Sequence, residues 1–502
     1  MMGKLLAVAV VAAAFGGGMY FGSQQNTTVL TDGSKGASYA GGFVADDHKG
    51  GTSDGAAAAN AKPGEIWLVK DGESIQEAVN AAQPGDTIRI MPGTYSETVY
   101  IDKDGIRLIG VIEEGNWPTL EGEDRLNDAV LYSGNNIVVE NLKITHYKGN
   151  AIMGQAGNNF EIRNNLIVDT GVYGIFPQLG QNGIVEGNVI SGIEDAAIYV
   201  GMSDNVHVAH NEVFDSVAGI EIENSRHAIV ENNYVHHNTG GVLAFITPGL
   251  PIKTTRDVII RNNFIVDNNT ANFAAPGSTV SGIPAGTGIL IMAADEVVIE
   301  DNIITGNKTA GILVVDHASA SNVTIDPDSD PTPDKVAILD NFMMNNGYDS
   351  IPEVKGLMLA ELKTGDADIV RAGKVRDSCI RNRHRYTTAG LGVFADCEFD
   401  NTDGIDTYLL PEPVAAREID PSEQGKITYL GICTGCHTYT GRMIGPPVQV
   451  IQAMYMDNAE GLADYIAAPV KKRPDYPEMP PQDYLSEEVR LAVAEYMLAV
   501  GN

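Results

Sequence analysis

The 502-residue sequence predicts a mainly β protein: a right-handed parallel β-helix solenoid followed by a small all-α domain. Three observations lead to this prediction. Asparagine recurs with a period near 22 residues, and β-branched residues keep fixed positions around those asparagines. Residues 420–502 lose this repeat and instead carry helix-like segments around a Cys-x-x-Cys-His motif.

Composition limits the classes of partner. The formal net charge is −33 and the calculated pI is about 4.5. Such a surface repels phosphate backbones, so we expect no nucleic-acid partner. The 55 glycines indicate many tight turns rather than a helical bundle.

The N-terminal segment predicts export. Lys4 precedes an apolar run from Leu5 to Phe21, which is typical of a signal peptide or an uncleaved N-terminal anchor over residues 1–22. Residues 23–65 contain few large apolar residues and predict a flexible linker. We therefore expect a periplasmic, extracellular or envelope location in a bacterium, with membrane contact only through residues 1–22 if they are not cleaved.

Ordered structure is predicted to begin near Ile66. Ser74 and Glu77 form a possible capping box for a helix that runs to Ala82, and this helix is expected to close the first coil of the solenoid. The alternating residues from Thr87 to Met91 then predict a strand.

The solenoid is predicted over residues 66–400 from three aligned columns. The repeated asparagines are Asn165, Asn188, Asn211, Asn233, Asn263, Asn302 and Asn341. Three residues earlier stand Ile162, Val185, Val208, Val230, Ile260, Ile299 and Ile338, and two residues later stand Ile167, Ile190, Val213, Val235, Ile265, Ile304 and Met343. We expect the asparagine amides to stack from coil to coil and to satisfy one another's hydrogen bonds.

Insertions lengthen the later repeats. They cover residues 247–256, 268–286 and 319–333, and in solenoids such loops often build the binding face. Residues 345–400 predict irregular last coils, and residues 401–419 predict a linker into the C-terminal domain, residues 420–502.

On these repeats, residues 66–400 resemble the pectate-lyase-like β-helix superfamily, most closely its Asn-ladder repeat proteins, and the whole chain resembles exported bacterial β-helix proteins. The resemblance implies the fold, and it raises the possibility of lyase or epimerase activity. Alginate-type epimerases carry an Asp-Pro-His-Asp motif. The nearest stretch here, Asp326-Pro327-Asp328, has no histidine, so no catalytic residue is carried over.

Two further columns contain charged residues. Glu140, Arg163, Glu186, Ala209, Glu231, Arg261 and Glu300 lie two residues before the ladder positions and predict an ion ladder, with Arg163 or Arg261 as the alternative base of a lyase. Asp169, Asp215, His237 and Asp267 lie four residues after ladder asparagines. They form either a cluster that binds a cation such as calcium or acts in acid–base chemistry, or a column of ordinary turn residues.

The motif Cys433-Thr434-Gly435-Cys436-His437 is the attachment signature of c-type haem. Two thiols add to the vinyl groups of the porphyrin, and the adjacent imidazole becomes an axial iron ligand. A helix is predicted from Pro421 to Leu430 and another from Ser486 to Val500.

With Met479 in a proline-flanked loop, residues 418–502 resemble a small class I cytochrome c. The resemblance implies one covalent haem c on Cys433 and Cys436, with His437 and Met479 as axial ligands of the iron. The alternative for Met479 is a packing role. The other two cysteines, Cys379 and Cys397, either form a disulfide or remain free buried thiols.

Three functions follow from these observations. The first is one-electron transfer to a redox protein partner, with the β-helix as a docking or glycan-binding scaffold. The second is a carbohydrate-active enzyme, a lyase or epimerase on polysaccharide, with an accessory cytochrome. The third is a surface binding or structural module. Lys471-Lys472-Arg473 is either a docking patch near Met479 or a solvated basic run.

Overall fold

The computed structural model describes residues 64–417 and 419–501. The predicted signal peptide or anchor, residues 1–22, and nearly all of the predicted linker, residues 23–65, lie outside the described residues. Within the described ranges, no helix is both long enough and apolar enough to span a membrane.

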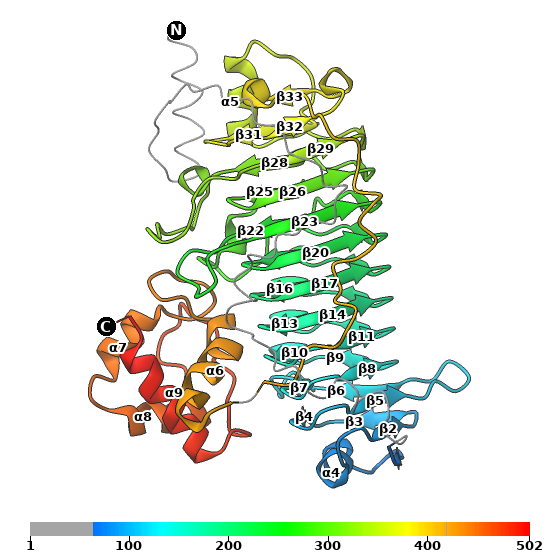
Figure 1. The fold of residues 1–502 in the computed structure, drawn as a ribbon, viewed down its shortest axis with the longest axis vertical. Helices are drawn as coiled ribbons and strands as arrows, with labels where there is room; N and C mark the ends of the chain where they lie inside the picture. Colours follow the sequence, from blue (N-terminus) through cyan, green and yellow to red (C-terminus); the bar gives the residue numbers. More distant parts are fainter. Residues whose placement is uncertain (1–63, 418, 502) are drawn as a thin grey trace.

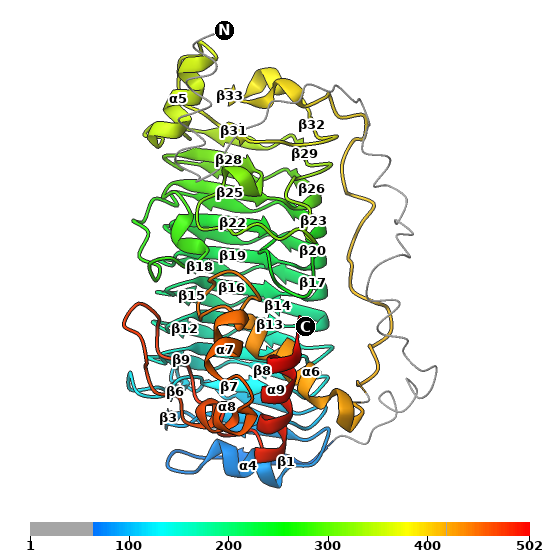
Figure 2. The same cartoon turned by 90° about the vertical axis from the view of Figure 1, so that its left-hand side faces the viewer.

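The described chain forms a parallel β-helix whose coils stack along the long axis of the molecule, with a helical domain against its side (Figures 1 and 2). Three parallel sheets, here named A, B and C, run along the stack, and each full coil contributes one strand to each sheet.

In spatial order, sheet A contains β1 (Ile66–Val69), β2 (Thr87–Ile90), β5 (Arg107–Gly110), β8 (Val138–Glu140), β11 (Glu161–Arg163), β14 (Gln181–Glu186), β17 (Asp204–Ala209), β20 (Arg226–Glu231), β23 (Arg256–Arg261), β26 (Asp295–Glu300), β29 (Ala337–Leu339) and β32 (Cys379–Ile380). Sheet B contains β3 (Gly93–Tyr95), β6 (Pro118–Glu121), β9 (Lys143–Thr145), β12 (Leu166–Val168), β15 (Val189–Ser191), β18 (Glu212–Phe214), β21 (Tyr234–His236), β24 (Phe264–Val266), β27 (Ile303–Thr305) and β30 (Phe342–Met344). Sheet C contains β4 (Val99–Ile101), β7 (Val130–Tyr132), β10 (Asn150–Gln155), β13 (Tyr173–Gln178), β16 (Ala196–Gly201), β19 (Ala218–Glu223), β22 (Gly240–Phe245), β25 (Thr287–Met292), β28 (Ala310–Val315), β31 (Ile369–Ala372) and β33 (Thr388–Ala389).

The predicted asparagine ladder is confirmed. Each asparagine from Asn165 to Asn302 donates its side-chain amide to the side-chain oxygen of the asparagine on the next coil, at 2.9–3.0 Å. The predicted isoleucine and valine columns on both sides point into the core and are almost fully buried. Register is therefore set by buried side chains that repeat in every coil.

A second ladder was not predicted. Asn238, Asn268, Asn307 and Asn346 stack in the same way, with amide-to-oxygen distances of 3.0–3.1 Å. Each lies five residues after a member of the first ladder, so the signal was present in the sequence. It starts only in the fourth repeat, because Ser216 holds the equivalent position one coil earlier.

Both ends of the solenoid are closed. The helix α4 (Ile75–Ala81) packs over the first coil, and its N-cap Ser74 accepts from the Glu77 amide, as predicted. At the other end, the expectation of irregular last coils is partly wrong: β31, β32 and β33 continue two of the sheets, and α5 (Pro352–Ala360) is inserted between β30 and β31.

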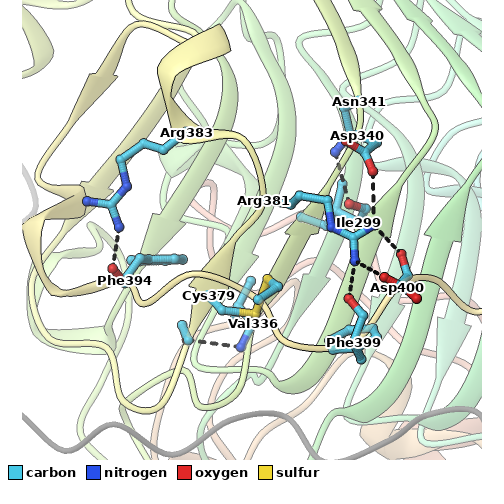
Figure 3. The surroundings of a disulfide bond; sticks show 12 residues. Ile299, Val336, Asp340, Asn341, Cys379, Arg381, Arg383, Phe394, Phe399 and Asp400 are labelled. Carbon is cyan, nitrogen blue, oxygen red and sulfur yellow. Dashed lines mark hydrogen bonds and ion pairs between the residues drawn. A yellow bond between two sulfur atoms is a disulfide. The ribbon is translucent and has the colours of Figure 1, made fainter.

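A disulfide joins the last strand of sheet A to the chain that follows it (Figure 3). It links Cys379 to Cys397, which decides between the two alternatives left by the sequence. Next to it, Arg381 donates to the backbone oxygens of Phe399 and Asp400, so the chain is held where it leaves the solenoid.

The chain then returns along the outside of sheet A. Residues 400–417, here called the strap, contain no helix or strand and run back past many coils (Figure 1). Thr402 binds Glu300, Asn205 donates to the Tyr408 carbonyl, and Arg417 donates to the Leu179 carbonyl. The strap thus carries the C-terminal domain back to the first half of the solenoid.

The C-terminal domain is helical, and its two helices predicted from sequence are present. It contains η5 (Pro421–Glu423), α6 (Gln424–Gly431), η6 (Cys433–Gly435), α7 (Val448–Met454), α8 (Ala459–Ala467) and α9 (Glu487–Ala499). The helices α7 and α8 were not predicted. Ser486 caps α9, which packs against α6 and α8 around Tyr429, Val493 and Met497.

The outer face of sheet C is covered. Its strands from β10 to β28 are six residues long and buried along their whole length. The helical domain covers the coils around β10 and β13, whereas the predicted insertions, the second of which contains η1 (Val280–Gly282), lie over later coils (Figure 2). The short helix η2 (His317–Ser319) ends where the third insertion begins. Sheet C is therefore the face on which the two parts of the molecule meet.

Candidate functional site

The Cys-x-x-Cys-His motif lies at the end of α6, in the turn η6. Cys433 and Cys436 are both free of disulfides and partly buried, and desolvation raises the pKa of each thiol to about 12. They are neutral thiols at physiological pH. Cys433 packs in the core of the helical domain, whereas Cys436 packs among side chains that line sheet C. The pair thus lies at the boundary between the domain core and the β-helix.

His437 is held in an orientation that suits a metal ligand. Its Nδ1 donates to the Pro446 carbonyl at 2.7 Å, which places the proton on Nδ1 and leaves Nε2 as the free lone pair. Burial lowers the pKa of the ring, so the imidazole is neutral. A Cβ on Gly445 would lie 2.3 Å from His437 Cε1, so only glycine permits this ring position.

Met479 is partly buried and packs against the same cluster as Cys433. The donor set is therefore two neutral thiols, one oriented neutral imidazole and one thioether, all in or beside the core of one helical domain. This chemistry fits covalent haem with histidine and methionine as axial ligands.

The motif also contacts the β-helix directly. Thr434 Oγ1 accepts from Gln178 Nε2 at 3.1 Å, and a Cβ on Gly435 would lie 2.8 Å from the Phe176 ring. Phe176 contacts Tyr173 at a tilt and Tyr199 edge-on, and the two tyrosine rings stack on each other; the ring centroids within this trio are 4.5–4.7 Å apart. An aromatic cluster on sheet C therefore lies directly under the motif.

Three carboxylates stand beyond this aromatic cluster, and the sequence analysis did not identify them. Asp195 precedes β16, and Glu221 and Glu223 lie on β19; all three are buried, with the two glutamates only 1% exposed. They line a small cavity of about 10 Å³, room for about one water molecule, together with Ser278, Met443 and Ile444. We call Asp195, Glu221 and Glu223 the carboxylate cluster.

The electrostatics of the carboxylate cluster are unusual. Burial raises the pKa of Glu223 to about 7. Burial and repulsion from Glu223 raise the pKa of Asp195 well above its ordinary value, and burial and repulsion from Asp195 do the same for Glu221. Each acid therefore holds its proton to a higher pH than in water. Groups that titrate near neutral pH can act as general acids and bases.

A pH dependence of stability follows from Glu223. Because its pKa rises on folding, the folded state binds this proton more tightly, and stability falls as the pH rises from about 4.5 to about 7. Glu223→Gln should remove this penalty and raise the free energy of unfolding at pH 8 by on the order of 3 kcal/mol, with little change at pH 4. Urea denaturation at pH 4 and pH 8 measures the change in the free energy of unfolding. An equal change at both pH values would contradict a raised pKa of Glu223.

The acidic column predicted from the repeats is exposed. Asp169, Asp215, His237 and Asp267 each follow a strand of sheet B and have φ between 52° and 55°. Short polar residues tolerate this left-handed conformation, so the turn alternative accounts for them. Among the described residues no group of three His, Cys, Asp or Glu side chains is arranged to hold a metal ion, and the possible calcium site therefore gains no support.

The predicted ion ladder is present on sheet A. Arg163 pairs with Glu186 at 3.6 Å, and Arg261 pairs with Glu231 at 2.6 Å and donates to Thr402 of the strap. Glu300 departs from the prediction: the strap buries it, and this burial raises its pKa to about 7. Both arginines are thus engaged with neighbouring side chains, which favours the structural role.

The basic run before Met479 is partly engaged. Lys472 lies over the rings of Tyr455 and Tyr465, and Arg473 pairs with Asp475 at 2.5 Å. Lys471 is exposed. The run lies on the surface of the helical domain.

The comparisons with known proteins concern the β-helix. Residues 125–247 and 245–329 match the family model described as right handed beta helix region. A comparison with curated proteins gives no match. Together with the strand order, the family match shows the predicted right-handed parallel β-helix.

Similar solved structures include the A-module of the mannuronan C-5 epimerase AlgE4 of Azotobacter vinelandii, with 14% identity and a TM-score of 0.40 over 65% of this chain and 91% of that chain. The alginate lyase of Paenibacillus sp. str. FPU-7 has 16% identity and a TM-score of 0.45 over 62% and 99%. The DFA-IIIase of Arthrobacter chlorophenolicus A6 has 14% identity and a TM-score of 0.42 over 68% and 100%. These likenesses extend to the fold alone.

Proposed function

We propose that this right-handed parallel β-helix protein is an exported one-electron carrier, with a single haem c bound covalently by its C-terminal domain. The observation that carries the proposal is the hydrogen bond from His437 Nδ1 to the Pro446 carbonyl, beside two free thiols at the required spacing. Bound haem would supply one-electron chemistry, and Cys433, Cys436, His437 and Met479 are the residues that would hold it.

The chain's own residues then have defined roles. Cys433 and Cys436 would hold the porphyrin covalently. The Pro446 carbonyl and the missing side chain of Gly445 hold the His437 ring, whose free Nε2 would be the iron ligand. Met479 would supply a thioether ligand. Bacteria attach c-type haem outside the cytoplasm, so in this proposal the protein is located there. It exchanges electrons with a redox protein.

Met479→Ala tests the axial ligand. Loss of the thioether should change the visible spectrum from six-coordinate low-spin iron and lower the midpoint potential by roughly 0.1–0.2 V, since axial ligands set haem potentials over about 0.8 V. Met456→Ala is the matched control, because Met456 is 72% exposed in the same domain. If the spectrum and the midpoint potential of the Met479 variant were unchanged, Met479 would have only a packing role.

A second candidate function is acid–base chemistry on a carbohydrate at the carboxylate cluster. The observation that favours it is three buried acids of raised pKa around one cavity. It is in keeping with the names of the similar structures, which include an epimerase and an alginate lyase. Incubation with neutral, acidic and amino-sugar polysaccharides, followed by NMR of the products, tests it. Any turnover should vanish in Glu223→Gln and persist in Glu212→Gln, which changes a carboxylate on the outer side of sheet B.

A further inference from the structure

The outer surface of sheet B carries an uncovered apolar strip at the end of the solenoid that is farther from α4. The strip consists of the outward residues of β21, β24, β27 and β30, which are Tyr234, His236, Phe264, Val266, Ile303, Thr305, Phe342 and Met344. They form two straight columns, because each strand pairs in register with the next. Tyr234, Phe264, Phe342 and Met344 are 42–51% exposed. Large apolar side chains gathered on one exposed face indicate an interaction site.

The strip is narrow, and part of it is held rigid by ring contacts. Neighbouring strands lie about 4.8 Å apart and alternate residues of a strand about 7 Å apart, so the strip measures about 15 Å by 7 Å. The ring of His236 stacks on that of Tyr234, with centroids 4.0 Å apart, and on that of Phe214 from β18 at 5.0 Å. An area of about 100 Å² is far below the roughly 800 Å² per partner that a stable protein interface buries. The strip therefore suits a slender, extended ligand better than a second copy of this chain.

The strip is free of formal charge, although the whole chain has a net charge of −33. None of its residues is Lys, Arg, Asp or Glu. It ends at Glu212, which holds the first column one coil earlier and pairs with His236 at 3.2 Å. The exposed turn residues along its two edges are polar and include Asn232, Asn262, His237 and Asp267. A ligand of this face thus meets an apolar surface in the middle and hydrogen-bonding groups at both sides.

We propose that the strip binds a neutral β-1,4-linked glycan, whose chain lies along the axis of the solenoid with its sugar rings on the aromatic side chains. In such a polymer the ring faces present C–H groups and the hydroxyl groups point to the two edges, which matches an apolar strip between polar turns. One coil spacing, about 4.8 Å, is close to the length of one sugar unit, so successive units meet equivalent positions.

Charge complementarity selects a neutral polymer. A uronate polymer brings one carboxylate per unit to a strip that offers no cation, on a chain of net charge −33. Anionic membranes and nucleic acids are disfavoured for the same reason. The inference depends neither on haem nor on the carboxylate cluster, since none of the residues of those two sites belongs to the strip.

Three linear hexasaccharides that differ in shape and charge test the proposal. Cellohexaose is neutral, β-1,4-linked and extended. Maltohexaose has the same composition but a coiled shape, and hexamannuronate is β-1,4-linked with a carboxylate on every unit. Each is titrated calorimetrically into the full chain at pH 7. We expect cellohexaose to bind at least tenfold more tightly than either of the others.

Variants place the binding on the strip. Phe264→Ala and, independently, Phe342→Ala should each weaken cellohexaose binding roughly tenfold, because each removes a ring on which a sugar stacks. Phe264→Trp keeps an aromatic ring and should retain the binding. Leu359→Ala is the matched control, because Leu359 is 73% exposed on α5, outside the strip. Circular dichroism checks that each variant is folded.

Several results would overturn the proposal: equal affinity for cellohexaose and maltohexaose, binding of hexamannuronate as tight as that of cellohexaose, unchanged binding in both alanine variants, or no binding of cellohexaose. Sedimentation velocity adds one more, since a dimer that Phe264→Asp dissociates would assign the strip to a second copy of the chain. Haem content is measured separately, so a failure here leaves the electron-carrier proposal standing, and a chain without haem leaves this inference standing.

Discussion

The double variant Cys433→Ala/Cys436→Ala should carry no covalent haem when it is expressed together with the machinery for export and haem attachment. The two thiols are the only cysteines in the chain outside the Cys379–Cys397 disulfide, so no other thiol can form the thioether bonds. Haem staining after denaturing electrophoresis should fall from about one haem per chain to background. Each single variant should keep one thioether bond and therefore part of the stain.

Thr434→Ser is the matched control for this experiment. It lies between the two cysteines and keeps the hydroxyl that donates to the Leu430 carbonyl and accepts from Gln178. We expect full haem content in this variant. If the double cysteine variant stained as strongly as the unchanged protein, the proposal of a covalent haem would be wrong. If the unchanged protein carried no haem after export, the proposed electron-carrier function would also be wrong.

Asn233→Ala should produce a large loss of stability. Asn233 donates to Asn263 Oδ1 and to the Val208 carbonyl, and it accepts from the amide and side chain of Asn211, all at 2.9–3.0 Å. Alanine leaves several of these buried groups without a partner. At about 1–3 kcal/mol for each unsatisfied group, we expect a loss of about 3–5 kcal/mol.

Urea denaturation followed by far-ultraviolet circular dichroism measures this loss. Asn80→Ala is a suitable control, because Asn80 is exposed on α4 and its loss should change stability by less than about 0.5 kcal/mol. Hydrogen exchange should show faster opening at the Asn211 amide, whose acceptor is lost, than at coils near β5. Uniform destabilisation along the stack would contradict a ladder that acts between neighbouring coils.

The uncovered part of sheet B differs from the other two faces. The strap lies along sheet A, and the helical domain and the insertions cover sheet C, whereas Tyr234, Phe264 and Phe342 remain 42–51% exposed on sheet B. These residues occupy one column, since Tyr234 pairs with Phe264, and Ile303 stands between Phe264 and Phe342. The docking or surface-binding role foreseen for the β-helix therefore has an available face on this side.

The fold was predictable because its determinants repeat. A column of asparagines flanked by Ile and Val identifies the coil, the buried face and the stacking direction, even though each repeat alone is weak. The same holds locally at Ser74 and Ser486, where a single cap residue marks the start of a helix. The helices α7 and α8 were missed because they are short and their positions depend on packing against α9.

The sequence by itself determined the solenoid, its asparagine ladder and the spacing of the residues expected to bind haem, because each depends on residue types at fixed separations along the chain. Only the tertiary structure decided which acids are buried. Asp215 and Glu221 are both carboxylates within one repeat, yet Asp215 lies in an exposed turn while Glu221 is covered by residues 278–280 and by Met443 and Ile444. That burial comes from segments tens to hundreds of residues away, and desolvation, which no local pattern encodes, is what changes the chemistry of those acids.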